Sequence, residues 1–278
     1  MRLIDFDQHF SQYLSDWMEE NQDTFDTHDQ MEEEAPAVYE RFLATPAPWL
    51  DGQAPGEYFQ QFSDPEELVA WMEEYLSEGV HVPDMLLNRV AELGLAAQDA
   101  LYHLLLNLDA PMESRMLAIS LLREIESDKP MDLYIRWQVT GEESPEISDN
   151  ALESLEEMGE EAIPAMLEAL PEATGSGKEG LLSVLSRYPG YDIVTDELME
   201  LFAQNPGRRA ILAAYLGRNM DARALPLLME AAEDDNTPYL DFIEIRNAIE
   251  ELGGDAPERE FNEEDSAYAA LFGWEEEE

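Results

Sequence analysis

The chain has four histidines, the side chains best suited to acid–base or metal chemistry: His9, His28, His81 and His103. No two of them stand at the i, i+4 spacing that places two zinc ligands on one helix face. Asp5, Asp7 and His9 alternate along the chain, but a helix at this place would spread them around its axis. We therefore expect a hydrated helix start here, and we expect His103 to pack between helices.

Other residue patterns give no complete catalytic or ligand-binding motif. Carboxylates are so numerous that no pair stands out as an acid–base dyad, and the acid-rich stretch 19–34 lacks the Asp-x-Asp-x-Asp-Gly order of a calcium loop. Residues 175–178 read Gly-Ser-Gly-Lys, but a phosphate-binding loop also requires an earlier glycine, a preceding strand and Ser or Thr after the lysine. Glu179 follows instead, so we interpret this stretch as a linker between helix pairs.

The chain contains no cysteine and no Gly-x-Ser-x-Gly turn that could expose a serine nucleophile. We expect no catalytic residue, no metal ligand and no cofactor, and we predict that the protein is not an enzyme. The N-terminus lacks the apolar run of a signal peptide, and no apolar stretch is long enough to span a membrane. The composition thus predicts a cytoplasmic protein.

Charge is the strongest signal in the composition. The chain has 64 Asp and Glu against 15 Lys and Arg, a net charge of −49. Such a field repels nucleic acid and anionic membranes and attracts basic proteins and cations. Two interpretations remain open: the acidity maintains solubility, including in a salt-rich cytoplasm, or it forms a face directed at a basic partner. Four arginines, Arg208, Arg209, Arg218 and Arg223, are expected to pair with neighbouring acids, with an anion site as the alternative.

Four aromatic residues cluster around a Pro-rich connector: Trp49, Tyr58, Phe59 and Phe62. One interpretation is that they cover the open end of the helices that follow, since a terminal repeat needs an atypical seal. The other is that they line a site for a peptide or a partner helix. We name these four as candidate partner-binding residues.

Apolar residues recur at three- and four-residue spacing along most of the chain, which predicts helices and no strand. Helix starts are marked by residues such as Ser63, Asp64 and Pro65, and many helix ends are marked by glycine. The predicted helices cover about 6–18, 37–43, 57–62, 63–79, 83–93, 96–108, 111–125, 128–137, 150–158, 160–170, 180–187, 191–203, 207–216, 221–233, 239–252 and 267–274. Residues 141–148 are predicted to be a polar break.

A sequence repeat organises the second half of the chain. Ala-Ile-Pro-Ala-Met-Leu-Glu-Ala-Leu at 162–170 returns as Ala-Leu-Pro-Leu-Leu-Met-Glu-Ala-Ala at 224–232, an offset of 62 residues. At half that offset, 31 residues, apolar side chains stand at matching positions: Ile193, Val194, Leu198 and Leu201. Two short helices of such a unit cannot bury their apolar stripe alone, so the repeat predicts stacking in an α-solenoid.

The unit at 158–167, Met-Gly-Glu-Glu-Ala-Ile-Pro-Ala-Met-Leu, resembles a HEAT-like repeat of the short bacterial kind that occurs in phycobilin lyases (the PBS-lyase type). The resemblance covers 150–170 and 207–233 best, 180–203 fairly and 63–139 weakly, and residues 1–62 do not show it. It implies a right-handed superhelix with a groove lined by the second helix of each pair. Relatives include lyases, DNA glycosylases and scaffolds. The glycosylases use a basic groove, opposite in charge to this chain, and no functional residue is carried over by position.

Together these observations predict an all-α fold, a right-handed α-α superhelix with an irregular helical N-terminal cap. The predicted domains are an acidic cap (1–62), HEAT-like repeats (63–255) and an acidic tail with a short helix (256–278). The predicted function is that of a monomeric, non-catalytic scaffold that binds a basic protein in its groove, with no nucleic-acid or membrane partner. The alternatives are an acidic inhibitor that mimics nucleic acid, such as an immunity protein, and a lyase-type enzyme, against which the lack of a singular nucleophile or base counts.

Overall fold

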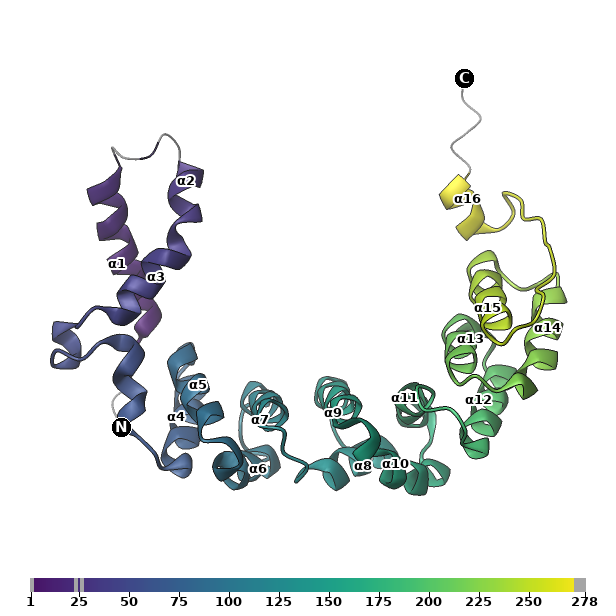
Figure 1. Ribbon diagram of the computed structural model, residues 1–278, viewed down its shortest axis with the longest axis horizontal. Helices are drawn as coiled ribbons and strands as arrows, with labels where there is room; N and C mark the ends of the chain where they lie inside the picture. The colour runs from purple at the N-terminus through teal and green to yellow at the C-terminus, as the bar shows by residue number, and fades with distance from the viewer. Residues whose placement is uncertain (1–2, 23–24, 26–27, 273–278) are drawn as a thin grey trace. The chain divides into compact units, whose positions relative to one another are not determined.

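The computed structural model describes residues 3–22, 25 and 28–272 (Figure 1). Within these ranges the chain forms α-helices and short 3₁₀-helices and no β-strand, so the predicted all-α class is confirmed there. None of the described helices is both long and apolar enough to cross a membrane.

The helices form two compact units, which we describe separately. Unit 1 comprises Met1–Pro130 and Pro145–Glu157, and unit 2 comprises Met131–Ser144 and Met158–Glu278. This division reflects which helices pack compactly together. It does not test the predicted domain boundaries after residues 62 and 255, which stay predictions. The helices of unit 1 are α1 (Phe6–Asn21), α2 (His28–Glu33), α3 (Ala35–Ala44), η1 (Pro48–Leu50), η2 (Pro55–Gln61), α4 (Pro65–Ser77), α5 (Asp84–Glu92), η3 (Gly94–Ala97), α6 (Gln98–Leu106), α7 (Met112–Glu124) and α9 (Pro145–Met158) as far as Glu157.

Unit 2 contains the clearest sequence repeats. Its helices are α8 (Met131–Thr140), η4 (Gly159–Glu161), α10 (Ile163–Ala169), η5 (Leu170–Glu172), α11 (Gly175–Leu185), α12 (Asp192–Gln204), η6 (Pro206–Arg208), α13 (Arg209–Arg218), η7 (Ala222–Ala224), α14 (Leu225–Glu233), α15 (Tyr239–Glu251) and α16 (Ser266–Phe272). The last predicted helix, 267–274, corresponds to α16, and its residues from 273 on lie outside the described residues.

Local signals set the helix starts. The carboxylate of Asp64 accepts a hydrogen bond from the backbone N–H of Glu66 at 3.1 Å, and Pro65 opens α4. Asp5 caps α1 in the same way by accepting from the N–H of Gln8 at 2.9 Å. A capping carboxylate satisfies a backbone donor that has no partner within the helix, which is why both starts could be predicted from the sequence.

In unit 1, the buried side chain of Tyr75 in α4 forms hydrogen bonds with the segment before α1. The hydroxyl of Tyr75 accepts from the N–H of Ile4 at 3.2 Å and donates to the carbonyl of Ile4 at 2.9 Å. Burial raises the pKa of Tyr75 to about 12, so the hydroxyl stays protonated and able to donate. The side chain is 1% exposed, and the segment before α1 is thereby packed onto the core of unit 1.

In unit 2, the two copies of the repeated sequence adopt the same local structure. A 3₁₀ turn, η4 or η7, leads into a short helix, α10 or α14, that carries a proline in its first turn. The alanine before each helix, Ala162 or Ala224, is fully buried. The shared proline and the shared buried alanine therefore have one explanation, which is that each copy makes the same tight entry into a packed helix.

Helices α13 and α15 lie side by side in unit 2 (Figure 1). A Cβ on Gly217 would lie 3.1 Å from the Cα of Ala248, a tight contact, so glycine favours this close approach. At the start of the same pair, the carboxylate of Asp241 accepts a hydrogen bond from the N–H of Ala210. Both pairs of positions differ by 31 residues, so the sequence offset is also the spatial register of these two helices.

Residues 175–178 are not a linker, and that prediction was wrong. They form the first turn of α11, which begins at Gly175. A Cβ on Gly177 would lie 1.7 Å from the backbone oxygen of Gln138, so glycine is needed for close contact between α11 and α8. The glycines that suggested flexibility are thus explained by packing. The predicted polar break at 141–148 is also shorter than expected, because α9 begins at Pro145.

Candidate functional site

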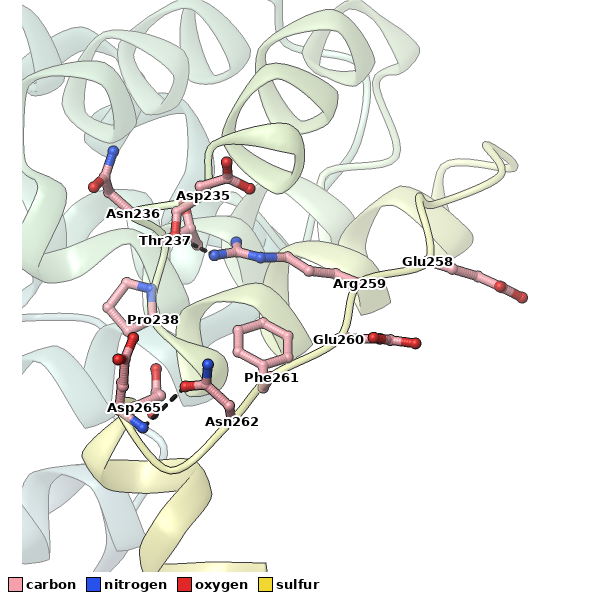
Figure 2. A pocket seen from close by; sticks show the side chains of 11 residues that line it. Asp235, Asn236, Thr237, Pro238, Glu258, Arg259, Glu260, Phe261, Asn262 and Asp265 are labelled. Atoms are coloured by element: carbon pink, nitrogen blue, oxygen red, sulfur yellow. Dashed lines mark hydrogen bonds between the residues drawn. The ribbon is translucent and has the colours of Figure 1, made fainter.

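A polar hollow lies where the C-terminal segment crosses the loop between α14 and α15 (Figure 2). Its walls come from residues 235–238 and from the segment 258–265. Arg259 crosses between these walls, and its Nη1 donates to the backbone oxygen of Asp234 at 2.8 Å. No sequence signal pointed to this hollow, because its two walls are separated by a whole helix.

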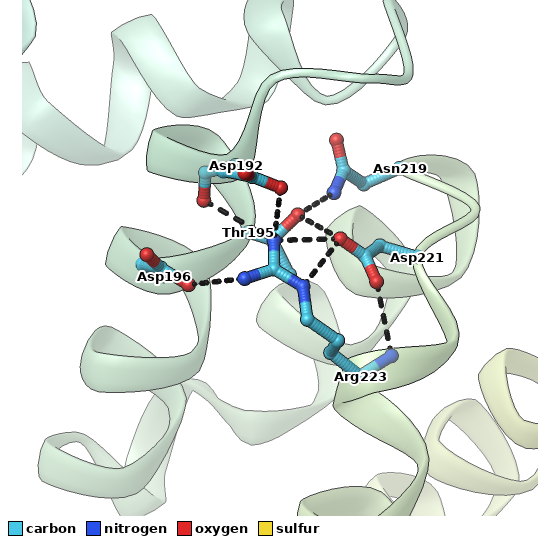
Figure 3. A network of polar contacts seen from close by, with 6 residues as sticks. All are labelled: Asp192, Thr195, Asp196, Asn219, Asp221 and Arg223. Carbon is cyan, nitrogen blue, oxygen red and sulfur yellow. Dashed lines mark hydrogen bonds and ion pairs between the residues drawn. The ribbon is translucent and has the colours of Figure 1, made fainter.

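A second polar cluster joins α12 to the turn before α14 (Figure 3). We call it the Arg223 network: Asp192, Thr195, Asp196, Asn219, Asp221 and Arg223. Arg223 donates to Asp192 at 3.0 Å, to Asp196 at 2.9 Å and to Asp221 at 2.7 Å. The hydrogen bond from Arg223 is the largest cause that lowers the pKa of Asp221, to about 2. Asp221 therefore stays ionised at any pH near neutrality.

The buried part of the Arg223 network is a chain of neutral side chains. The amide of Asn219 donates to the hydroxyl of Thr195 at 2.6 Å, and this hydroxyl donates to Asp221 at 2.9 Å. Asn219 and Thr195 are each 1% exposed. Because the Thr195 proton is used for Asp221, the arrangement fixes the turn to α12 and does not present an activated nucleophile.

Unit 1 has a similar set of polar contacts, which hold the turn after α7 against α6. Ser127 donates to the side chain of Gln98 at 3.1 Å, and Lys129 pairs with Asp99, the next residue of α6. In both turns the preceding residue has a left-handed backbone, with φ of 54° at Glu126 and 56° at Met220. The sequence did not predict this parallel, because the two turns use different residue types. Ser127 and Lys129 take the places of Asp221 and Arg223.

The structure brings the four predicted aromatic residues together and packs them against the chain itself. With Phe6 and Trp71 they form the aromatic cluster of unit 1: Phe6, Trp49, Tyr58, Phe59, Phe62 and Trp71. Ring centroids lie 5.4 Å apart between Phe59 and Trp71, and 4.6 Å apart between Phe62 and Trp71. Phe59 is 1% exposed, whereas Trp49, Tyr58 and Phe62 are partly exposed. These three side chains are thus accessible in part, and their role in partner binding stays a prediction.

Two of the four candidate arginines pair with acids as expected. Arg208 binds the carboxylate of Glu179, and Arg223 binds three aspartates. The other two lie over aromatic rings, Arg209 at 5.6 Å from the centroid of Phe202 and Arg218 at 4.9 Å from that of Tyr215. A guanidinium on a ring face is stabilised by the ring quadrupole. A count of acidic and basic residues does not include this interaction.

The histidines are spread over separate contacts. His9 stacks on Trp49 at 3.8 Å, and His81 approaches Asp7 at 3.2 Å. His103 was predicted to pack between helices, and this was wrong: its side chain is 69% exposed and lies 3.8 Å from Glu66. The side chain of His28 lies outside the described residues. Among residues 3–22, 25 and 28–272, no three His, Asp or Glu side chains are grouped so as to hold a metal ion.

Comparison of the chain with protein-family models, with curated proteins and with solved structures finds no match. The functional argument therefore depends on the residues of this chain alone.

Proposed function

We propose that the chain is a non-catalytic scaffold built from HEAT-like repeats in a right-handed α-α superhelix, and that its acidic surface binds a basic protein. Its binding groove, its monomeric state and its place in the cytoplasm belong to the same proposal. The recurrence of the η4–α10 entry at η7–α14, together with the 31-residue register of α13 and α15, supports the repeat assignment.

One observation carries the choice of partner: the chain has 15 bases against 64 acids, so internal ion pairs cannot neutralise its acidic charge. The bases held by carboxylates include Arg89, Arg123, Lys129, Arg136, Lys178, Arg208, Arg223 and Arg246. Complete pairing of all 15 bases would still leave 49 negative charges. A surface of this kind favours a cationic partner and disfavours nucleic acid.

The test is capture of partners by the full-length chain at about 0.1 M and about 1 M salt, between which the Debye length falls from about 10 Å to about 3 Å. The expected result is a basic protein that is identified by mass spectrometry, rebinds in purified form and is lost at high salt. A complex that persists unchanged at high salt would contradict the electrostatic basis of the proposal.

The same experiment separates the scaffold from the acidic mimic. If the captured protein cleaves or binds nucleic acid and stoichiometric amounts of the chain block that activity, the chain acts as an inhibitor. If the partner keeps its activity in the complex, the scaffold assignment stands.

A further inference from the structure

The segment that follows α15 is extended and has two different faces. Arg259 and Phe261 are partly buried against unit 2, whereas Glu258, Glu260 and Asn262 are exposed. Figure 2 shows Glu258 and Glu260 directed away from the loop that Arg259 approaches. Alternation of this kind is what an extended peptide shows when it lies on a surface and is recognised through every second side chain.

The first inward side chain, Arg259, is recognised mainly by backbone atoms. Its guanidinium donates to the carbonyl oxygens of Asp234 and Asp235, the former at 2.8 Å. It also lies 5.8 Å from the ring centroid of Phe242 and 4.7 Å from that of Phe261. Two carbonyl acceptors and an aromatic wall fit a planar cation with several donors, and a lysine could not reproduce both hydrogen bonds in the same plane.

The second inward side chain, Phe261, occupies an aromatic corner at the start of α15. Its ring centroid lies 5.0 Å from that of Tyr239, in an edge-to-face arrangement at 77°, and 5.2 Å from that of Phe242. Phe242 is itself 3% exposed and belongs to the core. The corner therefore provides a rigid apolar contact next to the polar contacts of Arg259.

The carboxylate of Asp265 accepts a hydrogen bond from the N–H of Tyr239 at 2.8 Å, but the outward residues of the segment are a poor electrostatic match for an acidic chain. Glu258, Glu260 and Glu264 are exposed, and the loop beside the segment carries the acidic residues Asp234 and Asp235. Like charges repel, and the net charge of −49 adds to the repulsion. The helix that follows, α16, packs Tyr268 and Phe272 on Tyr239, while Leu271 is 60% and Phe272 50% exposed. The contacts of Arg259, Phe261 and Asp265 thus hold a segment whose outward glutamates disfavour this position.

We infer that the surface formed by residues 234–238 and the start of α15 is a docking site for a basic partner segment with the pattern Arg-x-Phe, and that residues 258–265 occupy this site as an internal competitor. This inference deepens the proposed function and rests on it for the basic character of the partner. A partner segment with lysines at the two outward positions keeps both inward contacts and replaces repulsion by attraction.

The probe is a fluorescent peptide that copies residues 255–262 with lysine in place of Glu258 and Glu260: Asp-Ala-Pro-Lys-Arg-Lys-Phe-Asn. Its binding is measured by anisotropy to the full-length chain and to the double variant Arg259→Ala/Phe261→Ala, which removes both inward contacts of the segment and is called the released variant below. If the segment fills the site about nine-tenths of the time, release lowers the apparent Kd about tenfold, because only the open fraction binds.

Two matched controls sharpen the measurement. A scrambled peptide of the same composition, without Arg and Phe two residues apart, is expected to bind clearly more weakly to the released variant. The variant Glu258→Lys/Glu260→Lys is expected to hold its own segment more tightly and to bind the peptide more weakly than the natural chain. Circular dichroism and light scattering establish that each variant is folded and what its oligomeric state is.

Three results would overturn the inference. The scrambled peptide binds as tightly as the probe, the released variant binds the probe no better than the natural chain does, or the released variant forms a dimer whose second copy fills the site. Equal binding of the two peptides removes this site and leaves the proposed basic partner standing. Failure of both peptides on every variant counts against the site, and the salt-dependent capture experiment then decides separately on the proposed function.

Discussion

The aromatic cluster of unit 1 and the Arg223 network of unit 2 have the same structural role but use opposite chemistry. Each holds a turn-rich segment against a helix: η2 against α4 in unit 1, and the turn before α14 against α12 in unit 2. The aromatic cluster does so with tilted and edge-on rings around Phe59, which is 1% exposed. The Arg223 network does so with one cation, three carboxylates and two buried polar side chains.

The difference shows at which places an acidic chain can use ion pairs to stabilise its fold. Burial of aromatic surface is insensitive to salt screening and to the ionisation of carboxylates, so it serves segments that contain no cation. A cation that meets three carboxylates gains more here than in a balanced protein, because it relieves their mutual repulsion. With 15 bases for 64 acids, such fastenings are confined to a few turns, and burial must hold the rest.

Replacement of Phe59 by alanine is expected to have the largest effect. Removal of a fully buried phenylalanine leaves a cavity and costs about 3–5 kcal/mol of the free energy of unfolding. Urea unfolding followed by tryptophan fluorescence measures the loss, with Phe62→Ala as the control because its ring is partly exposed. Equal losses in the two variants would show that the cluster is not packed around Phe59.

Replacement of Asn219 by alanine is expected to have the next largest effect. The change removes the donor at 2.6 Å from Thr195 and leaves a buried polar site unfilled, at a cost of about 1–3 kcal/mol. The matched control is Asn247→Ala on the exposed side of α15. If thermal unfolding shifts equally in both variants, the buried hydrogen bond contributes nothing beyond the loss of an amide.

Acid is expected to weaken the Arg223 network and to leave the aromatic cluster unaffected. The pKa of Asp221 is lowered from 3.8 to about 2, so the folded state favours its ionised form. This stabilisation is complete above pH 3.8 and is lost as the pH falls through about 2. The measurement compares the natural chain with Asp221→Asn by urea unfolding over this range. The stability difference should shrink toward low pH, and a constant difference would contradict the assigned pKa.

Replacement of Arg223 by lysine is expected to have the smallest effect, below that of Asn219→Ala. Lysine keeps the charge but cannot hold the same set of hydrogen bonds to Asp192, Asp196 and Asp221. The pairs are partly exposed, so the loss should decrease at about 1 M salt, where the Debye length is about 3 Å. Arg246→Lys, at an exposed pair with Glu250, serves as the control. A loss that is the same at both salt concentrations would assign the effect to packing and not to charge.

Much of the candidate site could be anticipated as residue types but not as contacts. The sequence singled out Trp49, Tyr58, Phe59 and Phe62, and the structure joins them to Phe6 and Trp71. It also singled out Arg223 as an acid-paired residue without indicating which acids. The hollow at Arg259 was missed entirely. Arg259 is bound there by the backbone oxygens of Asp234 and Asp235. Because every residue has a backbone oxygen, the residue types do not indicate which ones bind an arginine.

The amino-acid sequence by itself determined the all-α class, most helix starts, the 31-residue offset and the excess of acid. These features are local or additive, because caps, prolines, apolar spacing and charge do not depend on which helices become neighbours. Only the tertiary structure decided that Gly177 serves close packing, that His103 faces solvent, and that Thr195 meets Asn219 and Asp221. The contacts of Gly177 and Thr195 join residues 24 to 39 positions apart, and they form only when helix packing brings separate parts of the chain together.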